Sequence, residues 1–302
     1  MKCEKQINKS QVVKAYIYGD TVEISSSNMH HYQSTLVLSG HRYVVLETGE
    51  IKEMNTNGTQ RTDNLSSIRR TMRKLRRLIT ANFSGGTDQL WVTLTYADDI
   101  NSKRISDTQI VYRDFKTFMN KLRLRVKPVE YISILEPQAS GRWHMHVLMK
   151  TTDESELFIE NSLMSDLWGR GFTFTKRLSD KDNVSAYVMS YVTNLKIGEG
   201  TSKKYVKGLR LYMYPKGTRI YRRSKGIVDP EVMTTTKEKL TEKFKMGESE
   251  KRAFYERSFT TKDGTKVVTQ TEFFDRKEIL KHDQSNNHKE RASSNGLPAQ
   301  PS

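Results

Sequence analysis

The chain has almost no cysteine and lacks long hydrophobic runs. Cys3 is the single cysteine among 302 residues, which excludes an internal disulfide and a zinc site built from thiolates. The opening segment, MKCEKQINKSQ, has no apolar stretch of the signal-peptide kind, and no later segment approaches the roughly 18 apolar residues of a membrane span. We therefore expect a cytoplasmic protein with no membrane contact, in which histidines and carboxylates would hold any metal.

Negative charge is scarce beside positive charge. Lys and Arg number 51 while Asp and Glu number 35, which gives a formal net charge of +16. An excess of this size is typical of proteins that bind a phosphate backbone, although an anionic membrane or an acidic protein would also attract it. The charge favours a nucleic acid as partner and says nothing about chemistry.

Hydrophobic periodicity predicts an α+β protein. Residues 1–60 have the composition of a β region, and NLSSIRRTMRKLRRLITANF repeats apolar residues at helical spacing. From residue 89 the pattern predicts the order β-α-β-β-α-β-α, as in a ferredoxin-like or RRM-like antiparallel sheet with flanking helices. The predicted strands are 89–96, 129–137, 142–150 and GFTFTKR, and the predicted helices are SDTQIVYRDFKTFMNKLRLRV, 153–168 and 183–196.

Two histidines occupy alternate positions of one predicted strand. Side chains alternate across a strand, so His144 and His146 project to the same side. The short loop PQASG predicts a hairpin, and a register that pairs Glu136 with Arg142 would bring the carboxylate diagonally to His144. Two imidazoles and a carboxylate suit a divalent cation that also binds substrate oxygens. The alternative is that the histidines are half-buried and hydrogen-bonded in a structural role.

Two tyrosines lie one helical turn apart in AYVMSYVTNLK. Tyr187 and Tyr191 share a helical face, and aromatic pairs at this spacing commonly serve packing. A phenol can also attack a phosphodiester when a metal neutralises the phosphate and a nearby base or cation stabilises the phenolate. The spacing alone leaves both interpretations open.

Taken in order, WVTLTY, EPQASGRWHMHVLM and AYVMSYVTNLK resemble the HUH-type rolling-circle replication initiators (Rep proteins) of plasmids and phages. In that family a strand ending in Thr-Leu-Thr precedes a His-hydrophobic-His strand and a helix that carries the tyrosine. The resemblance covers roughly residues 85–225, including YPKGTRIYRRSKG. It implies an HUH endonuclease fold.

The resemblance also assigns roles to single residues. His144 and His146 match the paired metal ligands, and Glu136 stands where many members place a third ligand for Mg²⁺ or Mn²⁺. Tyr187 matches the nucleophile, and Tyr191 matches the second tyrosine of members with Tyr-x-x-x-Tyr. The implied activity is site-specific nicking of one DNA strand at an origin, which leaves a 5′-phosphotyrosine on the protein and a free 3′-OH.

The chain departs from the family pattern beside the second tyrosine. Two-tyrosine members often carry lysines where this chain has Ser190 and Asn194, and Lys196 is the nearest substitute for a catalytic cation. The chain has no Walker-type Gly-Lys-Ser/Thr loop. The implied partners are therefore origin DNA, single-stranded or extruded as a hairpin, with a host helicase and a host polymerase.

Clusters of basic residues are the candidates for DNA contact. The helix around residue 70 carries six cations in nine positions without an acidic residue, which would repel one another unless they face phosphates. The expected DNA-binding residues are Arg69, Arg70, Arg73, Lys74, Arg76, Arg77, Arg142, Arg222 and Arg223.

These observations predict four parts. Residues 1–84 would be an N-terminal β region and basic helix that contacts DNA, and 85–228 the nicking domain. Residues 229–280 would form a charged helix, over 235–258, and a hairpin at FTTKDGTKVVTQ, followed by a disordered tail at 281–302. Two alternatives stay open: a non-catalytic nucleic-acid-binding protein, and a mobilisation relaxase or single-strand transposase with the same chemistry.

Overall fold

The chain has an α+β fold with antiparallel sheets. The computed structural model describes residues 6–29, 35–54, 65–97, 107–138, 140–178, 213–261 and 264–276, which hold three sheets and four α-helices. The chain divides into two compact units, which we call the central unit (Val37–Val44 and Ile51–Asp229) and the terminal unit (Met1–Leu36, Val45–Glu50 and Pro230–Ser302). No helix in these described ranges is long and apolar enough to cross a membrane.

The central unit is built on a five-stranded antiparallel sheet. Its spatial order is β10-β7-β8-β6-β9, which places the first strand of the unit between the third and the fourth. The bounds are β6 Gln89–Thr95, β7 Val129–Pro137, β8 Trp143–Thr151, β9 Thr173–Arg177 and β10 Tyr221–Arg223. The order β-α-β-β-α-β along the chain agrees with the sequence analysis, while the assignment to the ferredoxin-like type stays a prediction.

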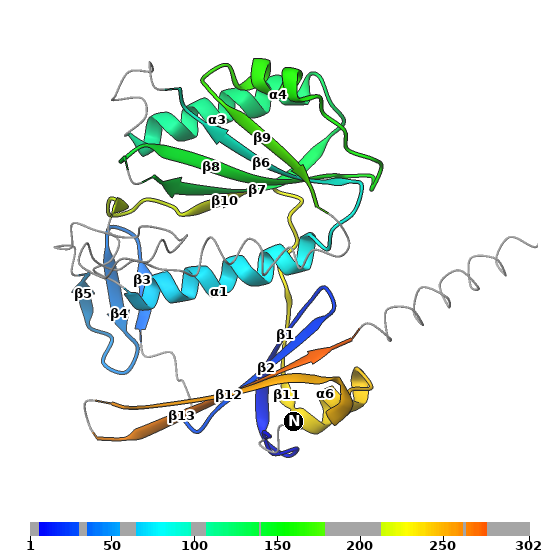
Figure 1. Cartoon of the computed structure of the whole chain (residues 1–302). Coiled ribbons are helices and arrows are strands. Elements are labelled where there is room, and N and C mark those ends of the chain that lie inside the picture. The colour runs from blue at the N-terminus through cyan, green and yellow to red at the C-terminus, as the bar shows by residue number, and fades with distance from the viewer. Residues whose placement is uncertain are drawn as a thin grey trace, which may run out of the picture. The chain divides into compact units, whose positions relative to one another are not determined.

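Three helices cover the two faces of this sheet. Figure 1 shows α3 (Thr108–Arg123) and α4 (Asn161–Trp168) on one side and α1 (Leu65–Asn82) on the other. The helix predicted over 153–168 is wrong in its first half, because residues 154–160 have no regular structure and α4 begins at Asn161. The final predicted helix, 183–196, lies outside the described residues.

The basic helix α1 packs as its sequence predicts. The residues of its apolar stripe are all buried, and they are Ile68, Met72, Leu75, Leu78 and Ile79. Burying each such side chain contributes about 1.5–3 kcal/mol. Helix α3 begins where the Asp107 carboxylate accepts the Gln109 N–H at 2.8 Å. Hydrophobic burial and capping thus decide both helices locally.

The two faces of the sheet can be told apart by their contacts. The Tyr96 hydroxyl donates to Asp114 of α3 at 2.9 Å, so the even-numbered side chains of β6 face α3. Lys150 on β8 lies 5.9 Å from the ring centroid of Phe83, which directly follows α1. The odd-numbered residues of β6 and the even-numbered residues of β8 therefore share the α1 side of the sheet.

The terminal unit joins segments from both ends of the chain. Its sheet has the order β11-β1-β2-β13-β12. The bounds are β1 Val12–Tyr18, β2 Thr21–Ser27, β11 Glu231–Thr236, β12 Lys251–Thr260 and β13 Lys266–Asp275, with α6 at Lys237–Lys243. Segments that the sequence analysis treats as separate extensions thus pair in one sheet.

The helix predicted over 235–258 is wrong for most of its length. Only Lys237–Lys243 is α-helical, and Lys251–Thr260 is a strand that pairs with β13 through a hairpin. The hairpin predicted from Asp-Gly is confirmed. Long-range pairing has overridden the helix propensity of the Lys- and Glu-rich segment.

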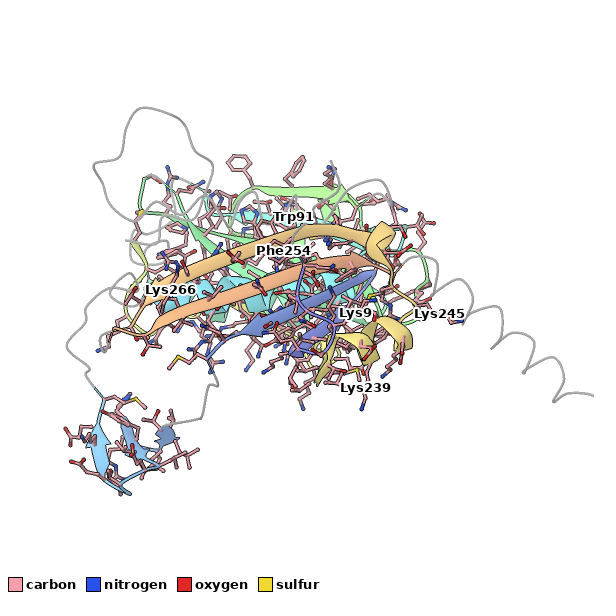
Figure 2. All side chains as sticks on the ribbon, turned by 90° about the horizontal axis from the view of Figure 1, so that it is seen from below. Lys9, Trp91, Lys239, Lys245, Phe254 and Lys266 are labelled. Carbon is pink, nitrogen blue, oxygen red and sulfur yellow. The ribbon has the colours of Figure 1, made fainter. Side chains whose placement is uncertain are left out.

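A buried ion pair closes the terminal unit. Lys237 Nζ lies 2.9 Å from Glu272 Oε2 and donates to the Ile7 carbonyl at 3.0 Å, and Glu272 Oε1 accepts the Ile7 N–H at 3.0 Å. Both side chains are almost fully buried, at 2% and 0% exposed. Exposed lysines of the same unit are labelled in Figure 2; they are Lys9, Lys239, Lys245 and Lys266.

A small three-stranded sheet completes the described structure. It has the order β3-β4-β5, with β3 at Thr35–Leu38, β4 at Arg42–Val45 and β5 at Ile51–Glu53. The β region predicted within residues 1–60 is thus divided between this sheet and β1–β2 of the terminal unit. The tail predicted at 281–302 lies outside the described residues.

Candidate functional site

The hairpin β7–β8 brings the predicted carboxylate and histidines onto one face. Glu136 is paired directly with His144, and Ile134 with His146. The predicted pairing of Glu136 with Arg142 is wrong, because Gln138 N–H donates to the Arg142 carbonyl at 2.6 Å and so sets a shorter turn. The difference is two residues, and an even shift keeps the carboxylate on the side of the histidines.

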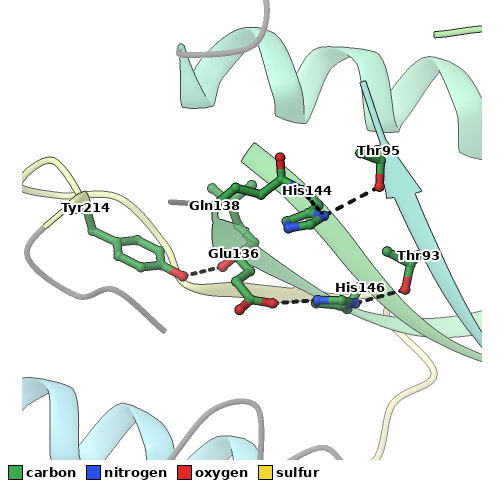
Figure 3. Close-up of polar contacts among 8 residues, drawn as sticks. Thr93, Thr95, Glu136, Gln138, His144, His146 and Tyr214 are labelled. Carbon is green, nitrogen blue, oxygen red and sulfur yellow. Dashed lines mark hydrogen bonds and ion pairs between the residues drawn. The ribbon is translucent and has the colours of Figure 1, made fainter. Parts of the chain in front are cut away.

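Two threonines of the neighbouring strand contact the histidines. The register of β6 with β8 pairs Thr93 with His146 and Thr95 with His144. Each hydroxyl lies near the Nδ1 atom of its partner, at 3.1 Å for His146 and 3.4 Å for His144, as Figure 3 shows. The sequence analysis assigned these threonines no role. Their alternation, Thr-Leu-Thr, was a signal that both face the same side as the His-Met-His pair.

His146 links three groups in a row. Its Nε2 atom lies 2.6 Å from Glu136 Oε2, and both residues are buried. An ionised carboxylate only accepts hydrogen bonds, so Nε2 carries the proton and the Thr93 hydroxyl donates to Nδ1. The ring of His146 stacks on Trp91, with centroids 5.0 Å apart. These contacts hold the imidazole in one orientation.

His144 lies closer to the surface than His146. Its Nδ1 atom is 3.3 Å from the Gln138 amide nitrogen, and its ring centroid is 5.6 Å from that of His146 with 30° between the planes. His144 is half-buried, whereas His146 is 7% exposed. The pair therefore runs from the sheet interior toward solvent along β8.

The donor set suits a divalent cation, although it is not assembled as a finished site. Within the described ranges, no three His, Cys, Asp or Glu side chains surround a common point in the manner of metal ligands. Glu136 and His146 instead contact each other, and a carboxylate so close to an imidazole nitrogen is a combination that binds metals in other proteins. Hydrogen bonds at Nδ1 are typical of metal-binding histidines, in which they orient the ring.

Four described tyrosines near this sheet are poor candidates for a nucleophile. Burial raises the pKa of Tyr214 well above its usual range, and its hydroxyl donates to the Leu135 carbonyl. Burial also raises the pKa of Tyr112 to about 12. The pKa values of Tyr131 and Tyr221 are raised too, by burial first. The predicted nucleophiles Tyr187 and Tyr191, and the predicted cation Lys196, lie outside the described residues.

The predicted DNA-binding residues of α1 lie on the histidine side of the sheet. Figure 1 shows α1 there, and its side chains differ in exposure. Arg69, Arg70, Arg73 and Lys74 are exposed, and Arg76 and Arg77 are half-buried. An exposed basic helix on the face that carries the histidines is suited to a phosphate backbone.

The other three predicted DNA-binding residues are dispersed. Arg142 lies in the β7–β8 turn, where its Nε atom is 3.3 Å from Ser140 Oγ. Arg222 lies over the ring of Tyr112 in α3, 3.7 Å from its centroid, and so faces the opposite side of the sheet. Arg223 forms an ion pair with Asp229 at 2.6 Å. The structure brings none of the three into contact with the histidines.

Comparison with known proteins places a family match in the middle of the chain. Residues 89–196 match the family described as replication-associated protein ORF2, a segment that begins at β6 and includes both histidines and both predicted tyrosines. No curated protein and no solved structure shows significant similarity to the chain. The match supports a role in DNA replication for this segment.

Proposed function

We propose that the chain, whose central segment resembles replication-associated proteins, nicks one DNA strand to initiate rolling-circle replication of a plasmid or phage. The proposal includes a tyrosine nucleophile and a divalent metal. The observation that carries it is the convergence of Glu136, His144 and His146 on one sheet face inside the matched segment. The basic helix on the same side of the sheet adds a surface for the DNA backbone.

The chain's own residues would hold the metal through imidazole and carboxylate groups. Mg²⁺ or Mn²⁺ would withdraw charge from the scissile phosphate. His146 gives up the proton on Nε2 when this nitrogen becomes a ligand, and Nδ1–H then donates to the Thr93 hydroxyl. A hydroxyl both donates and accepts, so Thr93 can serve either tautomer of the ring. Glu136 would leave its contact with His146 to become the third ligand.

The bond-breaking step belongs to a tyrosine. The phenolate oxygen of Tyr187 forms a bond to phosphorus, and the bond from phosphorus to the 3′ oxygen breaks, with that oxygen taking a proton. The product is a 5′-phosphotyrosine and a free 3′-OH. The reverse step, with Tyr191 as a second nucleophile, would rejoin the strand, and Lys196 would stabilise a phenolate.

A covalent-adduct assay tests this proposal. The full chain is incubated with Mn²⁺ and random-sequence single-stranded 60-mers that carry a 3′ fluorophore, because the labelled fragment keeps the 5′ end that joins the protein. We expect a fluorescent band that survives SDS. The variants His144→Ala and His146→Ala should lose the band while they retain binding to the 60-mers. His41→Asn, which removes an imidazole from the small sheet, is the matched control and should keep it.

The tyrosine variants decide the nucleophile. Tyr187→Phe should abolish the adduct, and Tyr255→Phe, in the terminal unit, should not. An adduct that persists in the double variant Tyr187→Phe/Tyr191→Phe would overturn the assignment. No adduct with wild-type protein across DNA sequences and metals would overturn the nicking proposal itself.

One observation favours a second candidate function. The Glu136–His146 contact is already satisfied without a metal, as it would be in a structural histidine of a non-catalytic nucleic-acid-binding protein. In that case His146→Ala would lower the stability of the protein and its DNA binding together. Retained folding with lost Mn²⁺ binding would favour the nuclease.

A further inference from the structure

Two phenylalanines at the edge of the central sheet are unusually exposed. Phe172 and Phe174 are 75% and 61% exposed, and they lie just before and within the edge strand β9. Burying a phenylalanine would contribute about 1.5–3 kcal/mol, and apolar side chains on an edge strand favour unwanted association. Exposed aromatic rings at such a place commonly mark a binding surface.

The register places both rings on the face that carries the histidines. Phe174 is paired with Thr93, and the Thr95 N–H donates to the Phe172 carbonyl at 2.9 Å. Directly opposed residues of an antiparallel pair project to the same face. Two rows therefore cross the sheet from β9 through β6 to β8, and they are Phe174–Thr93–His146 and Phe172–Thr95–His144.

The backbone that carries the rings is held firmly against β6. Gly171 has φ +146°, and a Cβ atom there would lie 2.3 Å from Ala97 N and 2.4 Å from Thr95 O. Ala97 N–H also donates to the Arg170 carbonyl at 2.9 Å. The rings are thus exposed on an ordered support rather than on a loose loop, and the glycine allows the close approach.

The spacing of the rings matches the geometry of nucleic-acid bases. Two residues apart on a strand, they are separated by about 6.7 Å, roughly twice the 3.4 Å rise of stacked bases. The histidines lie two strands away, about 10 Å at the usual strand spacing. Bases next to a phosphate at Glu136, His144 and His146 would therefore be within reach of the rings.

Charge favours a polyanion over a protein as the occupant. Lys176 follows Phe174 on the same face of β9, the exposed cations of α1 lie on that side of the sheet, and the chain carries a net charge of +16. Aromatic rings beside cations are the usual means of binding single-stranded nucleic acid, because every base has a face that can stack.

We infer that Phe172 and Phe174 form a platform on which bases of single-stranded DNA stack as the strand passes toward the histidine site. The inference rests on the proposed function for its direction toward that site. The affinity for single strands that it assigns to the two rings needs no cleavage.

Binding to a dT20 oligonucleotide tests the platform. Affinity is measured by fluorescence anisotropy on the full chain in EDTA, so that metal and cleavage play no part. Phe172→Ala and Phe174→Ala should each weaken binding between about fivefold and about 150-fold, and binding to a 20-bp duplex should be unchanged. Phe158→Ala is the matched control, because Phe158 is 71% exposed in the segment between β8 and α4, and it should bind as wild type does.

Further variants separate stacking from general apolar contact. Phe174→Trp should bind dT20 at least as tightly as wild type, whereas Phe174→Leu should bind as weakly as Phe174→Ala. Unchanged dT20 binding in the double variant Phe172→Ala/Phe174→Ala would overturn the inference. If that variant also lost a self-association seen for wild type by sedimentation velocity, the rings would belong to an interface with a second copy.

The two proposals can fail independently. A wild-type protein that forms no adduct but binds dT20 through the two rings would sink the nicking proposal alone. A double variant that forms the adduct and binds dT20 as wild type does would sink the platform alone.

Discussion

The two units each bury a carboxylate against a nitrogen group, and they do so differently. In the terminal unit, Glu272 and Lys237 are almost fully buried, and backbone groups of Ile7 take up further hydrogen bonds of both. In the central unit, Glu136 contacts His146, whose neighbour His144 is partly exposed. The first pair is closed by the chain itself, whereas the second continues toward solvent.

The difference separates a structural pair from one that can exchange its partner. A buried Lys–Glu pair keeps its charges at neutral pH and fits where nothing is to be bound. A histidine is a better metal ligand than a lysine, because a neutral imidazole presents a lone pair. The contrast predicts that changes in the terminal unit affect stability and that changes at the histidines affect ligand binding.

The largest expected effect is the loss of one partner of the closed pair. Lys237→Met leaves Glu272 charged and buried, which should lower the free energy of unfolding by about 3–5 kcal/mol. Chemical denaturation at pH 7, monitored by circular dichroism, measures the change. The double variant Lys237→Met/Glu272→Leu should recover much of the loss, since it leaves no buried charge. Equal stability of Lys237→Met and wild type would remove the contrast between the units.

A smaller effect is expected at the threonines beside the histidines. Thr93→Val keeps the shape of the side chain but removes the hydroxyl at His146 Nδ1, and it should weaken Mn²⁺ binding about 10- to 100-fold. Isothermal titration calorimetry measures the affinity, and the melting temperature should change little. Thr93→Ser should restore binding, because it restores the hydroxyl, and Thr117→Val on α3 is a control that should have no effect. Failure of the serine variant to rescue would mean that the hydroxyl does not position the ring.

The smallest effect concerns an exposed ion pair. The hydrogen bond from Arg223 lowers the pKa of Asp229 below its ordinary value of 3.8. The pair therefore stabilises the fold above about pH 4, and its contribution is lost as the pH falls through the lower pKa of the folded state. With side chains 31% and 53% exposed, the contribution should be only about 0.5 kcal/mol. Asp229→Asn should be less stable than wild type by this amount at pH 7 and should match it near pH 2, as measured by denaturation at both values.

Local patterns predicted the elements that depend on local forces. The apolar stripe of α1, the strands β6 to β9 and the Asp-Gly hairpin follow from periodicity and turn chemistry. The face shared by Glu136 and the two histidines was also predictable, because side chains alternate along a strand. Its register was not, since the turn is one hydrogen bond tighter than the loop sequence indicates.

Long-range pairing accounts for what the sequence could not predict. Nothing near Thr93 in the sequence indicates His146, 53 residues away, and only the order of the strands joins them. The same holds for Phe172 and Phe174, whose strand pattern was predicted while their position beside the threonines was not. In residues 251–260 the charged composition favoured a helix, and pairing with β13 decided the outcome.

The terminal sheet also imposes an order of events during synthesis. Strands β1 and β2 emerge from the ribosome early, but their outer neighbours are β11 and β13, which are translated about 200 residues later. At about 5–20 residues per second, the first hairpin waits for roughly 10–40 seconds with unpaired edges. The central unit can fold in that interval, so the nascent chain would acquire its candidate DNA-processing face before its two ends meet.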